Sequence, residues 1–400
     1  MNRERILQLA PLLAEGRIYY NPERERIEAN LPTGAPSNHA PSLLELDNGD
    51  LLCVWFGGSD EGSGDISILM SRLPEGGGAW TAPVTLTHDD TKADQNPSLF
   101  QAPNGDLWLV HTSMDTRGCT LEEWQRRLAA GEAEGPYAMQ HTSRIRCRVS
   151  KDRGHSWGEP FTLFDREGSF CRHPIQVLSN GDWIFAVWYS FLDGRSAFGS
   201  DYSAVMISSD EGRTWKEHAV PGSAGRVHMS IVEQDPGQLI AFFRSRAADR
   251  IYVSRSDDFG RTWTEPVRTE LPNNNASIRA MKLRSGKLAV VYNDVSVNDD
   301  PHRTIWPYER YPVTIALSED GGETWPYRRH IEAGDGYCGS ANRNGNRRYE
   351  YPFILQTKDG LIHAVYAYRT RVWIKHAAFT EDWIVGNGEN GWPWSNFPVS

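Results

Sequence analysis

A hairpin pattern that occurs six times along the chain limits its possible folds more than any other feature. Each copy has a short apolar strand, a turn that ends in glycine, and a second strand rich in β-branched and aromatic residues. The six turn glycines are Gly49, Gly105, Gly181, Gly237, Gly286 and Gly360. Asn-Gly and Asp-Gly favour tight hairpins because their turn types need positive φ. Apolar residues on both strands predict hairpins buried on both faces. An all-β repeat architecture follows.

A second repeat, Ser-x-Asp-x-Gly-x-Ser/Thr-Trp, follows several of these hairpins. It occupies residues 150–157, 208–215, 256–263 and 318–325, and a degenerate copy ends at Trp80. Asp and Ser side chains hydrogen-bond nearby backbone to close a turn, and Gly supplies the unusual φ. The Trp side chain is expected to pack between neighbouring sheets. We interpret these turns as structural.

The second repeat resembles the Asp-boxes of the sialidase superfamily, also called BNR repeats. The resemblance extends from about residue 39 to residue 376. It implies a six-bladed β-propeller of four-stranded blades, in which an N-terminal strand near residues 24–31 closes the last blade. Radial repetition leaves few exposed strand edges. We expect one domain over residues 1–400, with a short amphipathic helix at about residues 3–15.

Composition excludes several classes of protein. The net charge of −10 argues against a nucleic-acid binder, which carries a basic stripe. No apolar stretch is long enough to predict a membrane span. The five cysteines are widely spaced, without a CxxC pair, which predicts neither a disulfide framework nor a zinc site. The N-terminus lacks a secretory pattern, so we expect a cytoplasmic protein. We also expect no metal and no cofactor.

Long irregular segments point to one face of the propeller. Segments 115–141, 295–309 and 329–348 all fall in the connections opposite the glycine turns and the Asp-boxes. Extra chain length gathered on one face is typical of a binding mouth. Within the first segment, Thr120 and Glu123 form a capping box that predicts a short helix at this mouth.

Aligning the hairpins on their glycines predicts which residues surround the centre of the propeller. Nine positions before the glycines come Ala40, Asn96, Arg172, His228, Ser277 and Tyr351. Seven positions after them come Phe56, Thr112, Trp188, Arg244, Asn293 and Ala367. Polar side chains inside an apolar strand pattern need a reason, because unpaired burial is costly. A catalytic ring supplies that reason.

The resemblance implies roles for some of these residues. Retaining sialidases use three arginines on the substrate carboxylate, a tyrosine paired with a glutamate, and an aspartate acid. Arg244 and Arg310 match two of the arginines, and Tyr351 matches the tyrosine. A pair of guanidinium groups gives a carboxylate charge-assisted, bidentate hydrogen bonds.

The chain departs from the family pattern at three positions. His39 replaces the first arginine, and His228 stands where the glutamate is expected. No acid occupies the usual aspartate position, so Asp60 or Glu61, just beyond it, is our candidate proton donor. The predicted catalytic set is therefore Tyr351, His228, His39, Asp60 and Glu61.

Further residues around the predicted ring are candidates for binding the substrate. Together with Arg244 and Arg310, they are Arg172, His173, Asn96, Trp188 and Arg348. The predicted partner is an acidic oligosaccharide or glycan, and we expect neither nucleic acid nor membrane as a partner.

Three functions remain open from the sequence. In hydrolysis, Tyr351 attacks the anomeric carbon after His228 takes its proton, and Asp60 or Glu61 protonates the leaving oxygen. In β-elimination, the arginines neutralise a uronate carboxylate, His228 or His39 removes the neighbouring proton, and Tyr351 protonates the departing oxygen. A glycan-binding propeller without turnover is the third possibility, because fold does not fix function.

Overall fold

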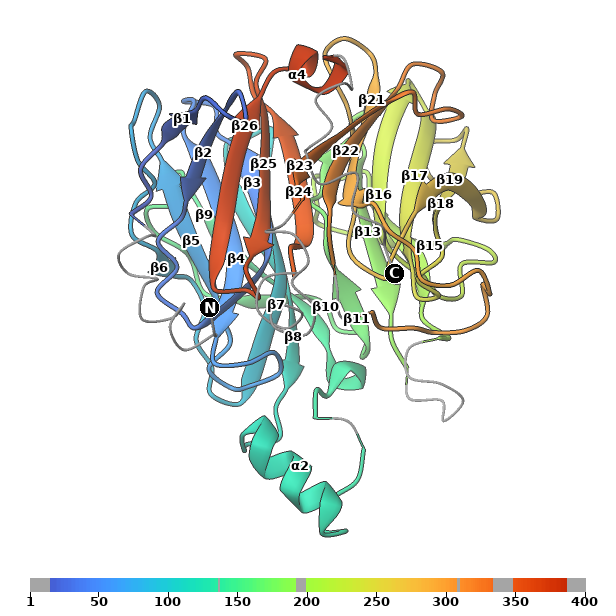
Figure 1. Cartoon of the computed structure of the whole chain (residues 1–400). Helices are drawn as coiled ribbons and strands as arrows, with labels where there is room; N and C mark the ends of the chain where they lie inside the picture. The colour runs from blue at the N-terminus through green and yellow to red at the C-terminus, as the bar shows by residue number, and fades with distance from the viewer. Residues whose placement is uncertain (1–14, 136, 192–198, 308–309, 334–347, 387–400) are drawn as a thin grey trace, which may run out of the picture.

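Each predicted hairpin lies within one of six antiparallel sheets in the computed structural model (Figure 1). The structure describes residues 15–135, 137–191, 199–307, 310–333 and 348–386. The predicted helix at about residues 3–15 lies almost entirely outside these ranges. In the four four-stranded sheets, neighbouring strands follow one another along the chain, which is the meander expected of a propeller blade.

The first three sheets contain the following strands. The first sheet has β3 (Ser37–Glu45), β4 (Leu51–Gly58), β5 (Ser67–Leu73) and β6 (Val84–Thr85). The second has β7 (Lys92–Gln101), β8 (Leu107–Asp115), β9 (Arg144–Ser150) and β10 (Phe161–Phe164). The third has β11 (Ser169–Cys171), β12 (Gln176–Val177), β13 (Trp183–Tyr189), β14 (Tyr202–Ser208) and β15 (Lys216–Ala219).

The last three sheets complete the ring. The fourth has β16 (Arg226–Asp235), β17 (Gln238–Ser245), β18 (Arg250–Ser256) and β19 (Val267–Pro272). The fifth has β20 (Arg279–Lys282), β21 (Leu288–Asn293), β22 (Val313–Ser318) and β23 (Tyr327–Glu332). The sixth has β24 (Glu350–Gln356), β25 (Ile362–Tyr368), β26 (Trp373–Phe379), β2 (Arg26–Asn30) and β1 (Tyr19–Asn21).

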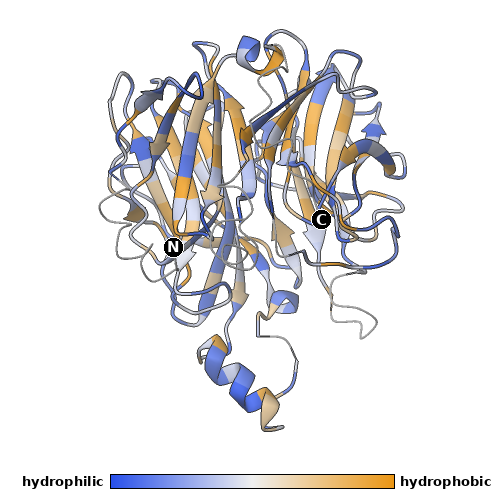
Figure 2. Cartoon of the chain, in the orientation of Figure 1, coloured by the Kyte–Doolittle hydropathy of each residue, from blue (hydrophilic) through white to orange (hydrophobic). Residues whose placement is uncertain are grey.

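Hydrophobic side chains fill the seams between adjacent sheets, and these seams close a ring. One buried cluster joins the first and second sheets through Val54 and Leu109. Another joins the sixth sheet to the first through Val365 and Trp55. Figure 2 shows the hydrophobic residues concentrated along the strands. The six-bladed β-propeller predicted from the repeats is therefore confirmed.

An N-terminal strand completes the last blade. The strand β2 pairs antiparallel with β26, with Ile27 opposite Ala378, at the place expected for residues 24–31. Buried charges hold this junction: Glu28 contacts Arg26 at 2.5 Å and Lys375 at 3.1 Å. This pairing joins the two ends of the propeller sequence, so the ring does not depend on side-chain packing alone.

The Asp-boxes pack each sheet against the preceding one. The glycine of each box is in the left-handed region, and its Cα faces side chains of the previous blade; Gly260, for example, faces Ile184. Within that box, Asp258 accepts hydrogen bonds from the backbone N–H and the hydroxyl of Thr262 at 2.8 and 2.7 Å. These contacts support the structural interpretation of the boxes.

The predicted helix at the mouth is present. The helix α2 (Leu121–Ala129) begins after Thr120, whose hydroxyl accepts a hydrogen bond from the Glu123 N–H at 3.1 Å. Figure 1 shows α2 projecting away from the sheets beyond the end of β8. It therefore extends the face opposite the glycine turns and does not lie across the sheets.

Other short elements lie outside the blades. The 3-10 helix η1 (Gln140–Thr142) follows the α2 segment, and α4 (Glu381–Val385) follows β26. The segment 329–348 was predicted to be irregular, but β23 continues to Glu332. Residues 334–347 of this segment lie outside the described ranges. In the described ranges no helix combines the length and hydropathy that a membrane crossing needs.

Candidate active site at the centre of the propeller

The predicted ring coincides with a backbone irregularity repeated in four sheets. Ala40, Asn96, His228 and Tyr351 have φ values of 52°, 51°, 53° and 51°. At each of these residues the register between the first two strands of the sheet shifts, as in a β-bulge. A left-handed residue other than glycine costs about 1–2 kcal/mol. The same cost at the same place in four blades indicates that the bulge serves the site.

Arg244 lies at the centre of the ring and contacts residues from three blades. Its Nη1 donates to the hydroxyl of Tyr351 at 2.5 Å and to Nε2 of His228 at 3.2 Å. Its Nε donates to Oδ1 of Asn275 at 2.7 Å. Because His228 Nε2 accepts this bond, Nδ1 carries the proton and donates to the Ser277 hydroxyl at 3.0 Å. The arrangement fixes the His228 tautomer.

The electrostatic surroundings of Tyr351 favour its ionised form. Burial opposes ionisation, but Arg244 and Arg310 outweigh it and hold the pKa of the phenol below its usual value of 10.0. The guanidinium carbon of Arg310 lies 5.5 Å from the centre of the phenol ring. The Tyr351 side chain is also flanked by His39, at 4.1 Å between ring centroids. A phenol that ionises readily is suited to act as a nucleophile.

A buried carboxylate, Glu350, gathers several cations beside Tyr351. Its Oε2 lies 3.3 Å from Nη1 of Arg310 and 2.8 Å from Nη2 of Arg371. Its Oε1 accepts a hydrogen bond from Arg348. Burial raises the pKa of Glu350, but Arg371, Arg310 and Arg348 together hold it well below 4.5. Glu350 is therefore the fixed anion of the site.

His39 is neutral at this position. Its Nε2 lies 3.4 Å from Oε2 of Glu350, a distance at which a protonated imidazole would form an ion pair. Burial, reinforced by Arg371, outweighs the attraction of Glu350 and holds the pKa of His39 well below 6.5. Burial and the nearby Arg244 likewise hold the pKa of His228 well below 6.5. Both imidazoles are thus uncharged near neutral pH.

The two candidate acids differ in position. Glu61 Oε2 accepts a hydrogen bond from Nη1 of Arg371 at 2.7 Å, which brings Glu61 to the edge of the cluster. Asp60 is exposed, and its Oδ1 accepts the backbone N–H of Glu61 at 2.9 Å. The structure therefore joins Glu61 to the ring and leaves Asp60 in the supporting turn.

Three of the predicted substrate-binding side chains face inward. Arg172 is 1% exposed and donates to the carbonyl oxygens of Pro41 and Tyr351 at 2.9 and 3.2 Å. His173 lies 3.2 Å from the carbonyl of His228. Trp188 is stacked on His228, with 4.3 Å between ring centroids. These contacts tie the three side chains to the backbone or rings of His228 and Tyr351, and their role in binding the substrate stays a prediction.

The remaining predicted residues lie at the ring or its edge. Arg244 and Arg310 are brought together with Tyr351 and His228, as the sequence predicted. Asn96 occupies the bulge of the second sheet and is 6% exposed. The side chain of Arg348 is 25% exposed, beside Glu350.

Sequence reasoning missed Glu350, Arg371 and Asn275. Glu350 directly precedes Tyr351 in a strand whose other residues are largely apolar, and an unexplained charge in such a strand was the available signal. Arg371 lies in the short turn between β25 and β26, on the mouth side of the sheet. This turn is short, so the long insertions that predict a binding mouth do not point to it.

In the part of the chain that the structure describes, no group of three or more His, Cys, Asp or Glu side chains is arranged to hold a metal ion. The four cysteines within the described ranges are free thiols. The ring brings Arg244, His228 and Tyr351 into direct contact.

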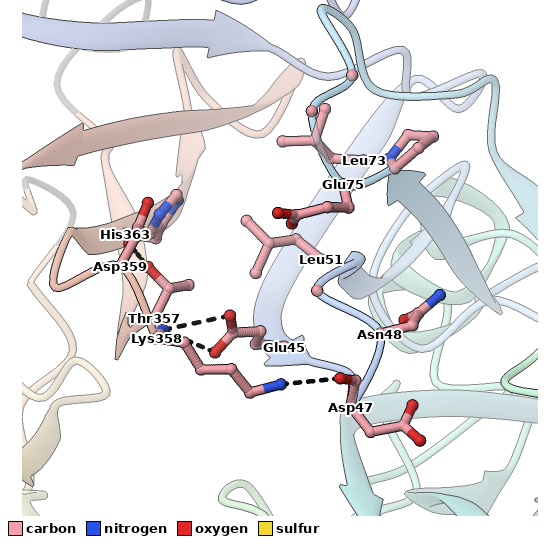
Figure 3. A pocket seen from close by; sticks show the side chains of 14 residues that line it. Glu45, Asp47, Asn48, Leu51, Leu73, Glu75, Thr357, Lys358, Asp359 and His363 are labelled. Carbon is pink, nitrogen blue, oxygen red and sulfur yellow. Dashed lines mark hydrogen bonds between the residues drawn. The ribbon is translucent and has the colours of Figure 1, made fainter.

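A separate cavity of about 520 Å³ lies at the hairpin end of the first and last blades (Figure 3). Its walls include Glu45, Asp47 and Lys358, and Lys358 donates from Nζ to the carbonyl of Asp47 at 3.0 Å. In the β3–β4 register Glu45 pairs with Leu51 next to the turn, whereas His39 pairs with Phe56 near the other end. The cavity therefore lies at the opposite end of these strands from Tyr351.

Comparisons with known proteins agree with this architecture. A family model described as a BNR repeat-like domain matches residues 49–364. A sialidase of Bacteroides fragilis is 24% identical over 306 residues, which cover 71% of this chain and 53% of that protein. A sialidase of Micromonospora viridifaciens is 24% identical over 407 residues, covering 94% and 56%. The chain thus spans about half the length of these relatives.

A solved structure gives the same fold. The Hadza microbial sialidase Hz136 superposes with a TM-score of 0.67 at 20% sequence identity, over 88% of this chain and 67% of that chain. Identity at this level establishes a common architecture, while the reaction of the present chain has to be argued from its own site.

Proposed function

Since this chain belongs to the BNR repeat-like domain family, and with it to the sialidase superfamily, we propose that it is a glycosidase. Its substrate is a glycan that ends in a carboxylate-bearing sugar. The reaction takes place at the centre of the propeller, where Arg244 and Arg310 bind the carboxylate beside Tyr351. A sialoside is the first substrate to test, because the relatives are named as sialidases.

The proposal depends most on one observation, the burial of the Arg244 guanidinium without a carboxylate partner among the described residues. Its side chain is fully buried, and within the described ranges no carboxylate lies within ion-pair distance of it. Its Nη2 is buried without a hydrogen-bond partner among the same residues. A buried charge left without a counter-ion is costly. Binding an anion at this position would remove that cost, and a sugar carboxylate has the planar geometry that a guanidinium prefers.

Tyr351 is the proposed nucleophile. A carboxylate nucleophile would be repelled by the substrate's own carboxylate, whereas a phenol is neutral until it reacts. The phenolic proton passes to Nε2 of His228, which contacts the same Arg244 nitrogen as the Tyr351 hydroxyl and gives up the hydrogen bond from Arg244 as it takes the proton. The Tyr351 oxygen then bonds to the anomeric carbon as the glycosidic carbon–oxygen bond breaks.

Glu61 is the proposed proton donor. Glu61 pairs with Arg371 as a carboxylate in the free protein, so it first takes a proton from solvent after leaving Arg371. It then gives this proton to the leaving glycosidic oxygen, and the aglycone departs as a neutral alcohol. In the second step Glu61 takes a proton from water, the water oxygen attacks the anomeric carbon, and the bond to Tyr351 breaks. His228 returns the proton to the phenolate. Two inversions at the same carbon leave the product with the configuration of the substrate.

A screen of sialate- and uronate-terminated oligosaccharides tests this function. The expected result is release of the terminal acidic sugar and a new reducing end, with no gain in near-ultraviolet absorbance. An increase in that absorbance would reveal the unsaturated uronate of β-elimination and would contradict hydrolysis. Binding of the oligosaccharides without turnover, unchanged in Tyr351→Phe, would identify a glycan-binding propeller.

A further inference from the structure

The turn that carries Arg371 is strained. Three successive residues, Arg369, Thr370 and Arg371, have φ values of 48°, 56° and 69°, and none of them is glycine. Each such residue costs of the order of 1 kcal/mol or more, and this strain persists only where the surroundings enforce it. Here the carbonyl of Arg371 accepts the N–H of Asn38, from the first blade, at 2.6 Å. The backbone of Arg371 is therefore fixed between two blades.

The side chain of Arg371 is divided between two carboxylates of different character. Its Nε and Nη2 both contact Oε2 of Glu350 at 2.8 Å, and Glu350 is fully buried. Its Nη1 donates to Glu61 at 2.7 Å, and the Glu61 side chain is 36% exposed. Glu350 is thus a permanent partner, whereas Glu61 reaches Arg371 from an exposed turn.

Arg371 also adjoins the arginine already assigned to the substrate. Arg310 Nη1 and Arg371 Nη2 approach the same oxygen of Glu350, at 3.3 and 2.8 Å. One carboxylate oxygen thus sets the two guanidinium groups side by side. A ligand carboxylate bound at Arg310 would lie next to the Nη1 of Arg371 that Glu61 occupies.

We propose that Glu61 is a place-holder for the ligand's carboxylate on Arg371, and that Arg371 is a specificity-determining residue of the anion site. This inference rests on the proposed function for the location of the ligand. When the acidic sugar binds, its carboxylate takes the Arg371 Nη1 from Glu61. The displaced Glu61 then lies free beside the sugar, where the proton donation proposed above requires it.

The loop of Glu61 permits this exchange. Asp65 accepts the N–H and the hydroxyl of Ser59, both at 2.8 Å, and so fixes the base of the loop. Ser63 is joined to Tyr137 at 3.2 Å between their hydroxyl oxygens. These bonds involve neither Oε atom of Glu61, so its side chain can turn away from Arg371 while the loop keeps its shape.

Binding of free N-acetylneuraminate, D-glucuronate and acetate to the whole protein tests the inference, with titration calorimetry as the readout. Glu61→Gln should bind N-acetylneuraminate or glucuronate roughly 3- to 10-fold more tightly than the wild type, since the competing ion pair is a partly exposed one. Glu211→Gln is the matched control, because it makes the same change at a side chain that is 73% exposed, in the Asp-box of residues 208–215. It should leave the affinity unchanged.

Arg371→Lys keeps a positive charge beside Glu350 and should weaken the binding of the same acids, most of all in the Glu61→Gln background. Equal affinities of Glu61→Gln and Glu211→Gln, or no binding of any of the three carboxylates by Glu61→Gln, would overturn the inference. The wild-type protein could instead bind acidic sugars but release none from any glycoside. That result would contradict the glycosidase proposal and would not contradict the role of Glu61 as a place-holder.

Discussion

The Nη1 of Arg244 hydrogen-bonds to the hydroxyl of Tyr351 at 2.5 Å, although the two residues lie 107 positions apart in the sequence, on β17 and β24. The bond joins the fourth blade to the sixth across the centre of the propeller. It places a buried positive charge on the oxygen that the proposed reaction uses as its nucleophile. Substitutions near this contact should change the activity, and substitutions in the propeller that holds it should change the stability.

Removing the charge of Arg310 should shift the pH dependence of the reaction. Arg310 helps to hold the pKa of Tyr351 below 10.0, so Arg310→Gln should raise that pKa. The rise of kcat/KM with pH should then move to higher pH, with a loss of roughly tenfold or more at neutral pH because Arg310 also binds the substrate carboxylate. The pH–rate profile and an ultraviolet titration of tyrosinate measure the shift.

A control for this prediction is Arg255→Gln, which removes a charge that is 39% exposed and paired with Glu323. Its profile should match that of the wild type. An Arg310→Gln profile that coincides with the wild-type profile would show that Arg310 does not act on Tyr351.

The junction that closes the propeller should weaken in acid. Burial raises the pKa of Glu28, but Lys375, Arg26 and Arg24 outweigh it and lower the pKa from 4.5 to about 2. Because the folded-state pKa is depressed, the stabilisation is present above pH 4.5 and is lost as the pH falls toward 2. Glu28→Gln should therefore lower the free energy of unfolding by about 3 kcal/mol near neutral pH and by progressively less in acid.

Urea denaturation at a series of pH values measures this difference. Glu25→Gln, at a side chain that is 61% exposed, is the control and should change the stability little at any pH. A constant difference between Glu28→Gln and the wild type from neutral pH down to pH 3 would be inconsistent with an ionised, paired Glu28.

An Asp-box substitution should affect stability and spare activity. Asp258→Ala removes the acceptor of the Thr262 hydrogen bonds and should lower the free energy of unfolding by about 1–2 kcal/mol. The values of kcat and KM should stay within twofold of wild type at a temperature where both proteins are folded. The exposed neighbour Asp257 supplies the control, Asp257→Ala. Lost activity with unchanged thermal stability would assign the box to substrate binding.

The sequence predicted the fold and half of the ring for one physical reason. A glycine turn fixes the register of its hairpin, so a residue nine positions before the glycine lies at the same height in every blade. His228 and Tyr351 were found in this way, and both lie at the bulges. The approach worked because the repeat is regular in sequence as well as in space.

The same approach could not determine which way a side chain turns. Arg172 and His173 are predicted ligands of the substrate, and the spacing did not show that both side chains also contact backbone carbonyl oxygens. A bulge brings two successive residues to one side, so Glu350 joins Tyr351 where simple alternation would separate them. Arg371 depends on three consecutive left-handed residues, for which the sequence offered no glycine as a signal.

Covalent trapping tests the central claim most directly. A fluorinated sialyl fluoride should form a long-lived glycosyl–enzyme adduct with the wild-type protein, and mass spectrometry of the digest should place the added mass on Tyr351. Tyr351→Phe should form no adduct while it stays folded. An adduct on another residue, or steady turnover of a sialoside by Tyr351→Phe, would contradict the assignment of Tyr351 as the nucleophile held by Arg244.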